Sequence, residues 1–240
     1  MIPQNISNAI EIISSFSDQR YPVNLDYICQ ELGIKVKKDQ PLGKDGYLVC
    51  GNGKKIILVN NRITNRHRQN FVIAHELGHF LLHRNQLYSC DHISDVGNQN
   101  INSQQQEAEA NEFANELLIP STELAKHIPV GPISFSDIFN IADTFDISVT
   151  HAAMQAVMAS NSESEVLICY EGQRRKWYKT AHRYTYSRMV PNYCPVNFLS
   201  AKSGTDITGA WTTLYHGSVH QEVFCPYGNQ YLVLLSGNRI

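Results

Sequence analysis

Two histidines and a glutamate form the pattern with the clearest chemistry in this 240-residue chain. His75 and His79 lie four residues apart in an apolar, helical pattern, so both imidazoles project from one helix face and can reach a single metal ion. Glu76 projects about 100° around the axis from His75, where a general base for a metal-activated water would lie. A random chain of this composition would contain the pattern about 0.02 times. A structural histidine pair is the alternative.

A catalytic zinc site needs a third protein ligand, and the helix predicted at residues 104–118 offers one. Glu107 precedes the apolar stripe of this helix by three residues and lies on the same side, whereas Glu109 points elsewhere. The stripe consists of Ala110, Phe113, Ala114 and Leu117. This geometry favours Glu107 over Glu109 as the ligand, and a solvated acidic helix face is the alternative.

Helices and a small sheet are expected around these residues. The histidines belong to a helix from about Thr64 to His83, and Pro120 ends the helix that carries Glu107. Helical spacing of apolar residues predicts further helices at 6–17, 25–32, 138–145 and 149–158. β-Branched runs between glycines and asparagines predict a small antiparallel sheet, with strands at 34–36, 47–50 and 56–59.

A serine-rich segment, residues 160–165, predicts a domain boundary. Beyond it, aromatic and β-branched runs broken by glycine and proline predict strands, including a hairpin at Val223–Leu235. The sequence therefore predicts an α+β fold, with a mainly helical domain at residues 1–160 and a mostly β domain at 166–240.

The run His75–His83, followed by Glu107–Pro120, resembles the ImmA/IrrE family of zinc metallopeptidases. That family has a glutamate, two variable residues, Ala-Asn or Ala-Asp, Phe-Ala and a Leu-Leu-x-Pro end. Glu107 matches the glutamate, and Asn111 matches the position where a side-chain oxygen orients a ligand histidine. The resemblance covers residues 5–155. It implies a gluzincin-like metallopeptidase domain, a carboxy-terminal sensor domain, and the metal ligands His75, His79 and Glu107.

The resemblance also implies an activity, which is zinc-dependent cleavage of a partner repressor of the helix-turn-helix type. Zinc would lower the pKa of its bound water from about 15.7 towards 7, and Glu76 would take the proton as the water attacks the scissile carbonyl. The ligand set alone also suits manganese or iron. His83 is expected to support the site rather than to bind the metal. Candidates for stabilising the oxyanion are His83, Tyr88 and His92.

Cys90 lies in the polar segment of residues 84–103, eleven residues after His79. A thiolate is a strong zinc ligand, so this cysteine could take the position of the water and silence the enzyme. The CapP branch of the same family, found in anti-phage operons, resembles this arrangement and is held inactive by such a cysteine. A plain loop thiol is the alternative interpretation.

Charge differs between the two predicted domains. Residues 1–165 hold 12 basic and 19 acidic residues, a net of −7, and residues 166–240 hold 8 and 3, a net of +5. Residues 173–188 contain six cations, four aromatic rings and no acids. Because stacking contributes about 1–3 kcal/mol per base and cations follow phosphates, this segment predicts a platform for single-stranded DNA as a damage signal. The candidate contacts are Arg174, Arg175, Lys176, Trp177, Tyr178, Lys179, Arg183 and Tyr184.

Two interpretations of this charge pattern that involve no nucleic acid remain open. The segment could be an ordinary β-domain with core aromatics, or the two domains could simply attract each other.

Composition excludes several classes of protein. Hydrophobic residues make up 42% and charged residues 18%, which allows a sizeable core and excludes a mainly disordered chain. Uninterrupted aliphatic runs such as Leu232–Leu235 are far shorter than the about 20 residues that cross a bilayer. The amino terminus shows no export signal, and the six cysteines have no Cys-x-x-Cys spacing. These features predict a cytoplasmic protein with reduced thiols and no membrane association.

Two other functions fit the same residues. A peptidase of this kind could act on an unrelated protein, and a non-catalytic, zinc-stabilised regulator could bind nucleic acid and a partner protein. Glu76 separates a peptidase from such a regulator, because a binding module has no use for a general base there.

Overall fold

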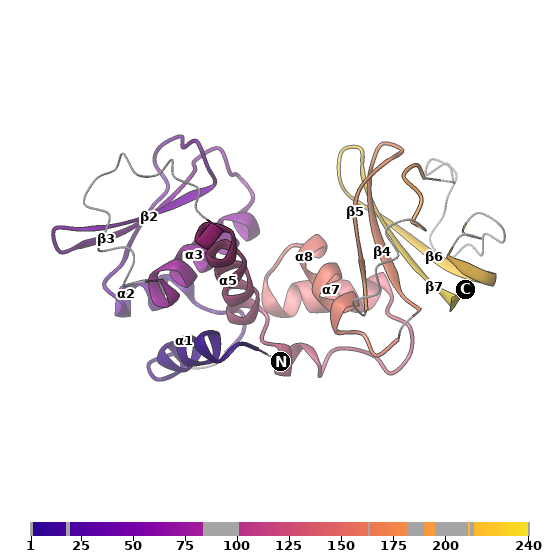
Figure 1. The fold of residues 1–240 in the computed structure, drawn as a ribbon, viewed down its shortest axis with the longest axis horizontal. Coiled ribbons are helices and arrows are strands. Elements are labelled where there is room, and N and C mark those ends of the chain that lie inside the picture. Colours follow the sequence, from indigo (N-terminus) through magenta and orange to yellow (C-terminus); the bar gives the residue numbers. More distant parts are fainter. Residues whose placement is uncertain are drawn as a thin grey trace. The chain divides into compact units, whose positions relative to one another are not determined.

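The structure, a computed structural model, describes residues 2–17, 20–83, 101–162, 164–181, 190–194, 211 and 214–239. The chain divides into two compact units, Met1–Pro120 and Ser121–Ile240 (Figure 1). Each unit combines helices with a β-sheet, so the fold is α+β, as the sequence predicts.

The helices described in the first unit are α1 (Gln4–Ser14), α2 (Leu25–Glu31), α3 (Arg66–Leu82) and α5 (Ile101–Leu118). Asparagine side chains cap two of them. Asn24 accepts a hydrogen bond from the backbone N–H of Tyr27 at the start of α2, and Asn65 accepts one from Arg68 at the start of α3. The helix predicted to carry both histidines is therefore present as α3, and the helix predicted to carry Glu107 is α5.

The sheet of the first unit has the strand order β1-β3-β2 and contains β1 (Lys35–Lys37), β2 (Gly46–Gly51) and β3 (Lys54–Val59). β2 and β3 form an antiparallel hairpin, but β1 pairs with β3 in parallel, with Val36 opposite Ile57. The sheet is thus mixed, and the prediction of an antiparallel sheet was wrong for β1. The chain reverses direction twice between β1 and β3, so the two strands run the same way.

Gly78, inside the histidine motif, allows α3 and α5 to approach closely. A Cβ atom at this position would lie 3.0 Å from Cδ1 of Phe113 and 3.1 Å from Cα of Ala110. The apolar stripe predicted on α5 meets α3 here, and Ala110, Phe113 and Ala114 are fully buried. Figure 1 shows the two helices side by side. This contact brings the polar residues that flank the stripe within reach of the histidines on α3.

We expect Gly78→Ala to lower the free energy of unfolding and the affinity for zinc. Alanine adds about 1 kcal/mol of helix propensity, but overpacking costs about 1–3 kcal/mol, and one of the obstructing groups is the backbone of Ala110, which cannot rotate away. Thermal unfolding and chelator competition measure the two effects. Gly51→Ala is the matched control, because a Cβ there meets no atom within 4 Å. Equal losses in the two variants would contradict this account of Gly78.

The second unit packs helices against an antiparallel sheet. Its helices are α6 (Ser121–Leu124), α7 (Phe135–Phe145) and α8 (Val149–Ala159). Its sheet has the order β5-β4-β7-β6 and contains β4 (Val166–Glu171), β5 (Arg174–Thr180), β6 (Tyr215–Tyr227) and β7 (Gln230–Arg239). β6 and β7 form a hairpin around the turn predicted within Val223–Leu235, and their pairing extends further than predicted.

The division between the two compact units follows Pro120, whereas the domain boundary predicted from the sequence lies in the serine-rich segment at 160–165 and stays a prediction. Contacts of α7 explain the difference. The Phe135 and Phe139 rings lie 5.6 Å and 5.1 Å from the ring of Phe224 on β6, and the Phe135 backbone N–H donates to Glu222 at 2.7 Å. The helices that the sequence assigns to the peptidase domain therefore share a core with the second sheet.

The opposite face of the second sheet is covered by a separate apolar cluster. Its members include the fully buried Trp211, Tyr170 and Tyr215, together with Val190 and partly buried Tyr178.

Among the residues that the structure describes, no helix has the length and apolar character needed to cross a membrane.

Candidate metal centre

Three side chains from α3 and α5 converge in the first unit. The Nε2 atoms of His75 and His79 lie 3.1 Å apart, as expected for rings one turn apart on one helix face. The Glu107 carboxylate reaches across from α5, with Oε2 3.3 Å from His75 Nε2 and Oε1 3.4 Å from His79 Nε2. The structure thus brings together the three residues that the sequence predicts as metal ligands.

The spacing of these atoms fits a zinc ion. Zinc binds histidine nitrogen and carboxylate oxygen at about 2.0–2.2 Å with tetrahedral geometry, which places neighbouring ligand atoms about 3.3 Å apart. The two Nε2 atoms lie 3.1 Å apart, which is near this value, and each has a different oxygen of Glu107 at 3.3 or 3.4 Å. One ligand atom from each of the three residues lies within 4.8 Å of the other two, close enough to share one ion. Two imidazoles and one carboxylate leave a fourth tetrahedral position open, which is the arrangement of catalytic rather than structural zinc sites.

Each histidine is held from behind through its other ring nitrogen. Nδ1 of His75 lies 3.1 Å from Oδ1 of Asn111, one turn beyond Glu107 on α5. Nδ1 of His79 lies 3.2 Å from Nδ1 of His83, which is buried. The Nε2 atoms of both ligand candidates therefore face the carboxylate of Glu107.

The electrostatics of the metal-free site favour neutral imidazoles. Burial lowers the pKa of His79 to about 4, and the neighbouring His75 ring adds to this effect. Burial also lowers the pKa of His75. At neutral pH the rings therefore carry lone pairs, which a metal ion requires.

Glu76 is buried beside the three ligand candidates and under the edge of β2. A Cβ atom on Gly46 would lie 2.9 Å from Oε1 of Glu76, so the strand approaches this closely only with glycine at position 46. Burial raises the pKa of Glu76 to about 7, and the Glu107 carboxylate adds to the rise, while Lys44 and a hydrogen bond from the Leu48 backbone oppose it. A carboxyl group with a pKa near neutrality suits proton transfer at neutral pH.

Other predicted residues of the first unit have different outcomes. His83 and Asn111 lie behind the ligand candidates. Cys90, Tyr88 and His92 fall outside the described residues, so the predicted inhibitory thiol and two of the oxyanion candidates have no structural description here.

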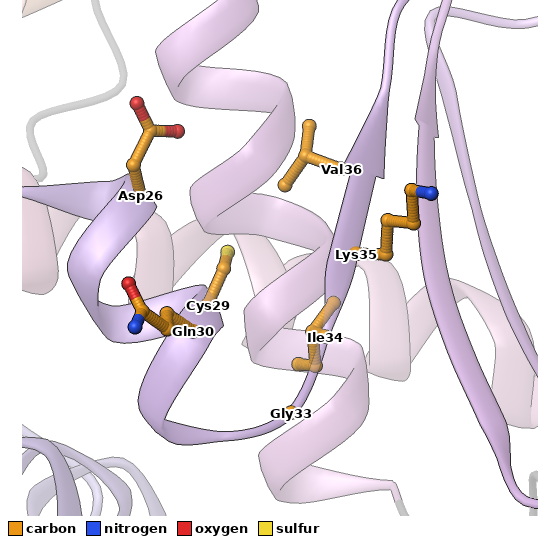
Figure 2. Close-up of a pocket in the computed structure, with 7 residues that line it drawn as sticks. All are labelled: Asp26, Cys29, Gln30, Gly33, Ile34, Lys35 and Val36. Atoms are coloured by element: carbon orange, nitrogen blue, oxygen red, sulfur yellow. The ribbon is translucent and has the colours of Figure 1, made fainter.

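A cavity of about 410 Å³ lies elsewhere in the first unit, between α2 and β1. Figure 2 shows its lining, with Asp26, Cys29 and Gln30 on the helix and Lys35 and Val36 on the strand. None of the three ligand candidates lines it. Burial raises the pKa of the Cys29 thiol to about 12, so this cysteine stays protonated at neutral pH and has little reactivity.

The predicted DNA platform lies partly on β5. Lys176 forms an ion pair of 2.6 Å with Glu171, and the Arg175 guanidinium lies over the ring of Tyr178 and donates to the backbone oxygen of Val190. Tyr178 packs against the apolar cluster of the second unit. Of the eight candidates, Arg183 and Tyr184 lie outside the described residues. Arg174, Trp177 and Lys179 lie on β5.

Sequence reasoning missed Glu109 and Gly46. Glu109 flanks the apolar stripe of α5 on the side opposite Glu107, and its Oε2 lies 3.0 Å from Nε2 of His83. The available signal was His83 itself, since a buried histidine next to a ligand needs a partner for its second nitrogen. For Gly46 the sequence offered a weaker signal of its closeness to Glu76, because a glycine at the start of a strand can occur there for many structural reasons.

Comparison with known proteins adds a family and a fold. Residues 29–155, just over half of the chain, match the model of the peptidase M78 family, described as an IrrE N-terminal-like domain. Among solved structures, a Mycobacterium tuberculosis transcriptional regulator has a similar fold, with a TM-score of 0.59 and 14% sequence identity over 98% of this chain and 76% of that chain. A search of curated proteins finds no match.

Proposed function

Because this chain belongs to the peptidase M78 family of metallopeptidases, we propose that it is a zinc-dependent endopeptidase that cleaves a helix-turn-helix transcriptional repressor. The observation that supports the proposal is the triangle of His75, His79 and Glu107, whose ligand atoms lie within 4.8 Å of one another and so can share one zinc ion. The buried Glu76 beside this triangle is the group that separates hydrolysis from mere metal binding.

The side chains divide the work of peptide hydrolysis. Bound zinc would supply a Lewis acid for the scissile carbonyl and for the attacking water. Glu76 takes the proton of that water and passes it to the leaving amine, a role that its pKa of about 7 suits. Asn111 and His83 keep the two imidazoles in place while the charge at the site changes.

A repressor as the substrate is the finer part of the proposal. It rests on the resemblance to the ImmA/IrrE family, and the transcriptional regulator of similar fold fits a role in gene control. A peptidase with an unrelated protein substrate is the nearest alternative. We further place the protein in the cytoplasm, where a repressor would meet it.

The experiment searches the neighbouring reading frames for a small helix-turn-helix protein and combines that protein with the purified chain. We expect one or a few discrete fragments by mass spectrometry, loss of cleavage with a zinc chelator, and recovery when zinc is restored. Cleavage that persists after complete removal of metal would contradict the zinc mechanism. Cleavage of an unrelated unfolded protein in place of the repressor would leave a peptidase with a different substrate.

We also propose that the second unit regulates cleavage by binding single-stranded DNA. The net charge of +5 over residues 166–240 supports this, as does a strand that carries Arg174, Trp177 and Lys179. Cys90 as an inhibitory zinc ligand belongs to the same proposal. The alternative is a non-catalytic, zinc-stabilised regulator that binds nucleic acid and a partner protein.

We expect Arg174→Glu and Trp177→Ala to weaken binding of a fluorescent, single-stranded oligonucleotide. A reversed charge loses phosphate contacts, and a lost ring removes about 1–3 kcal/mol of stacking per base. Fluorescence anisotropy at several salt concentrations measures both, and the arginine variant should also show a smaller salt dependence. Lys126→Glu is the charge-matched control, because Lys126 is an exposed cation of the same unit. If neither salt nor these variants changed the binding of the oligonucleotide, the proposed DNA-binding role of this strand would be wrong.

A further inference from the structure

We propose that the outer face of the sheet in the first unit is a docking surface for an acidic amphipathic helix of the protein substrate. The outer face is the side of the sheet turned away from α3. It has an apolar centre and a basic margin, formed by Tyr47, Val49, Ile56 and Leu58 and by Lys35, Lys37 and Lys54, respectively. The inference rests on the proposed function in taking a protein as the substrate, and it adds a surface outside the metal centre.

Contacts with α3 and the strand register define the two faces of this sheet. Gly46 faces α3, because a Cβ atom there would lie 2.9 Å from Oε1 of Glu76. Lys55 also faces α3, since its Nζ lies 5.1 Å from the centre of the Phe80 ring. Side chains alternate along a strand, so the odd-numbered residues of β2 and the even-numbered residues of β3 point to the outer face.

β1 continues this alternation at one margin of the sheet. Val36 lies opposite the fully buried Ile57, so Val36 belongs to the inner side. Lys35 and Lys37 therefore belong to the outer face. Figure 2 shows the side chains of Lys35 and Val36 on opposite sides of the strand. One long margin of the outer face is thus basic.

The centre of the outer face is one contiguous apolar patch. Tyr47 lies opposite Leu58, and Val49 lies opposite Ile56. Val49 is 42% exposed, and the other three are partly exposed. Apolar patches with a polar rim mark sites of protein interaction. Three strands about 4.8 Å apart form a face that one helix of about 10–12 Å diameter can cover.

The basic margin determines the charge of the partner. Lys35, Lys37 and Lys54 form no ion pair with any residue that the structure describes. Residues 35–59 hold six lysines and two aspartates, a net of +4, although residues 1–165 carry a net of −7. Acidic residues beside the apolar face of the partner would complement this margin. A second copy of the chain fits poorly, because a two-fold interface would bring the same lysines together.

β2 connects the outer face with the metal centre. Its outer side carries Tyr47 and Val49, and its inner side lies against Glu76 at Gly46. Within the described part of the chain, β2 is also an edge strand, so a bound polypeptide can pass round it from one face to the other. A substrate helix docked on the outer face would hold a neighbouring segment close to Glu76, which raises the effective concentration of that segment.

A synthetic helical peptide with leucines on one face and glutamates on the other tests the surface directly. The full chain carries zinc, a nitrogen-15 label and Glu76→Gln, so that the peptide stays intact. We expect NMR amide shifts confined to the sheet of the first unit, and an affinity that falls as salt rises. The same peptide with lysines in place of glutamates should bind at least about tenfold more weakly. Equal binding of both peptides, or shifts elsewhere, would overturn the proposal.

Two changes to the surface test its charge and its apolar centre separately. The pair Lys37→Glu and Lys54→Glu should weaken binding of the glutamate peptide at least about tenfold, and so should Val49→Glu. Lys126→Glu and Val130→Glu are the matched controls, because both residues are exposed in the second unit. Thermal unfolding checks that each variant is folded. Unchanged binding in the lysine pair would contradict the proposal, as would a dimer in sedimentation that Val49→Glu dissociates.

Kinetics on a cleaved protein test the link to the substrate. The lysine pair should raise KM for the protein at least about tenfold and leave kcat unchanged, because the outer face does not touch the reacting groups. A short peptide that contains only the scissile bond should be cleaved equally by the variant and the parental chain. An unchanged KM for the protein would show that the substrate does not use this surface. A chain that binds the glutamate peptide as expected but cleaves no protein keeps the docking surface and loses the proposed function.

Discussion

Glu76→Gln is expected to reduce kcat/KM for substrate cleavage by about 10²–10⁴-fold, the usual contribution of a general base. Glutamine has the same shape and can accept the hydrogen bond from the Leu48 backbone, but it cannot take a proton from water. The zinc content should stay unchanged, because the ligand triangle consists of His75, His79 and Glu107. A cleavage assay and metal analysis on the same preparation measure both.

The same variant has a second, independent readout in the stability of the metal-free protein. Because the pKa of Glu76 rises from 4.5 to about 7 on folding, the folded state binds more protons than the unfolded state between these values. Parental stability should therefore lose this contribution as pH rises from about 4.5 to 7, and the variant should lack that loss. The histidines titrate in both proteins, so the difference isolates Glu76. Parental cleavage activity in the variant would show that Glu76 is not the general base, and the proposed mechanism would be wrong.

Local geometry explains which parts of this site the sequence predicts. A four-residue spacing on a helix fixes the relation between His75 and His79, and the phase of the apolar stripe on α5 fixes which side Glu107 occupies. These relations depend on helix periodicity alone. Helix bounds and the β6–β7 hairpin were predictable for the same reason, because caps, prolines and turn residues act over short distances.

The remaining features depend on contacts between distant segments. The parallel pairing of β1 with β3 depends on which strand edge the chain returns to. The unit boundary depends on Phe224 meeting Phe135, 89 positions earlier in the chain. Glu109 reaches His83 only because Gly78 and Ala110 set the approach of α3 and α5. In each case the deciding term is packing between elements, which residue spacing within one element does not encode.

Glu107→Ala is expected to have the largest effect on metal binding among the variants of α5. One oxygen of this carboxylate lies 3.3 Å from Nε2 of His75, and the other lies 3.4 Å from Nε2 of His79. Without the carboxylate, two imidazoles alone leave zinc two ligands short of tetrahedral coordination. The loss of zinc affinity should therefore exceed the about 10–100-fold typical of residues that only orient a ligand. Chelator competition measures it, and cleavage should fall in parallel.

Glu109→Ala and Glu112→Ala make this test specific to the position on the helix. All three variants remove one acid from α5, so they change the net charge equally and each gains helix propensity. Zinc affinity should fall most for Glu107, less for Glu109, and hardly at all for Glu112, whose side chain is exposed. If Glu109 instead caused the greatest loss, the carboxylate at the metal would be misassigned, and the triangle on which hydrolysis depends would have to be rebuilt around His79 and His83.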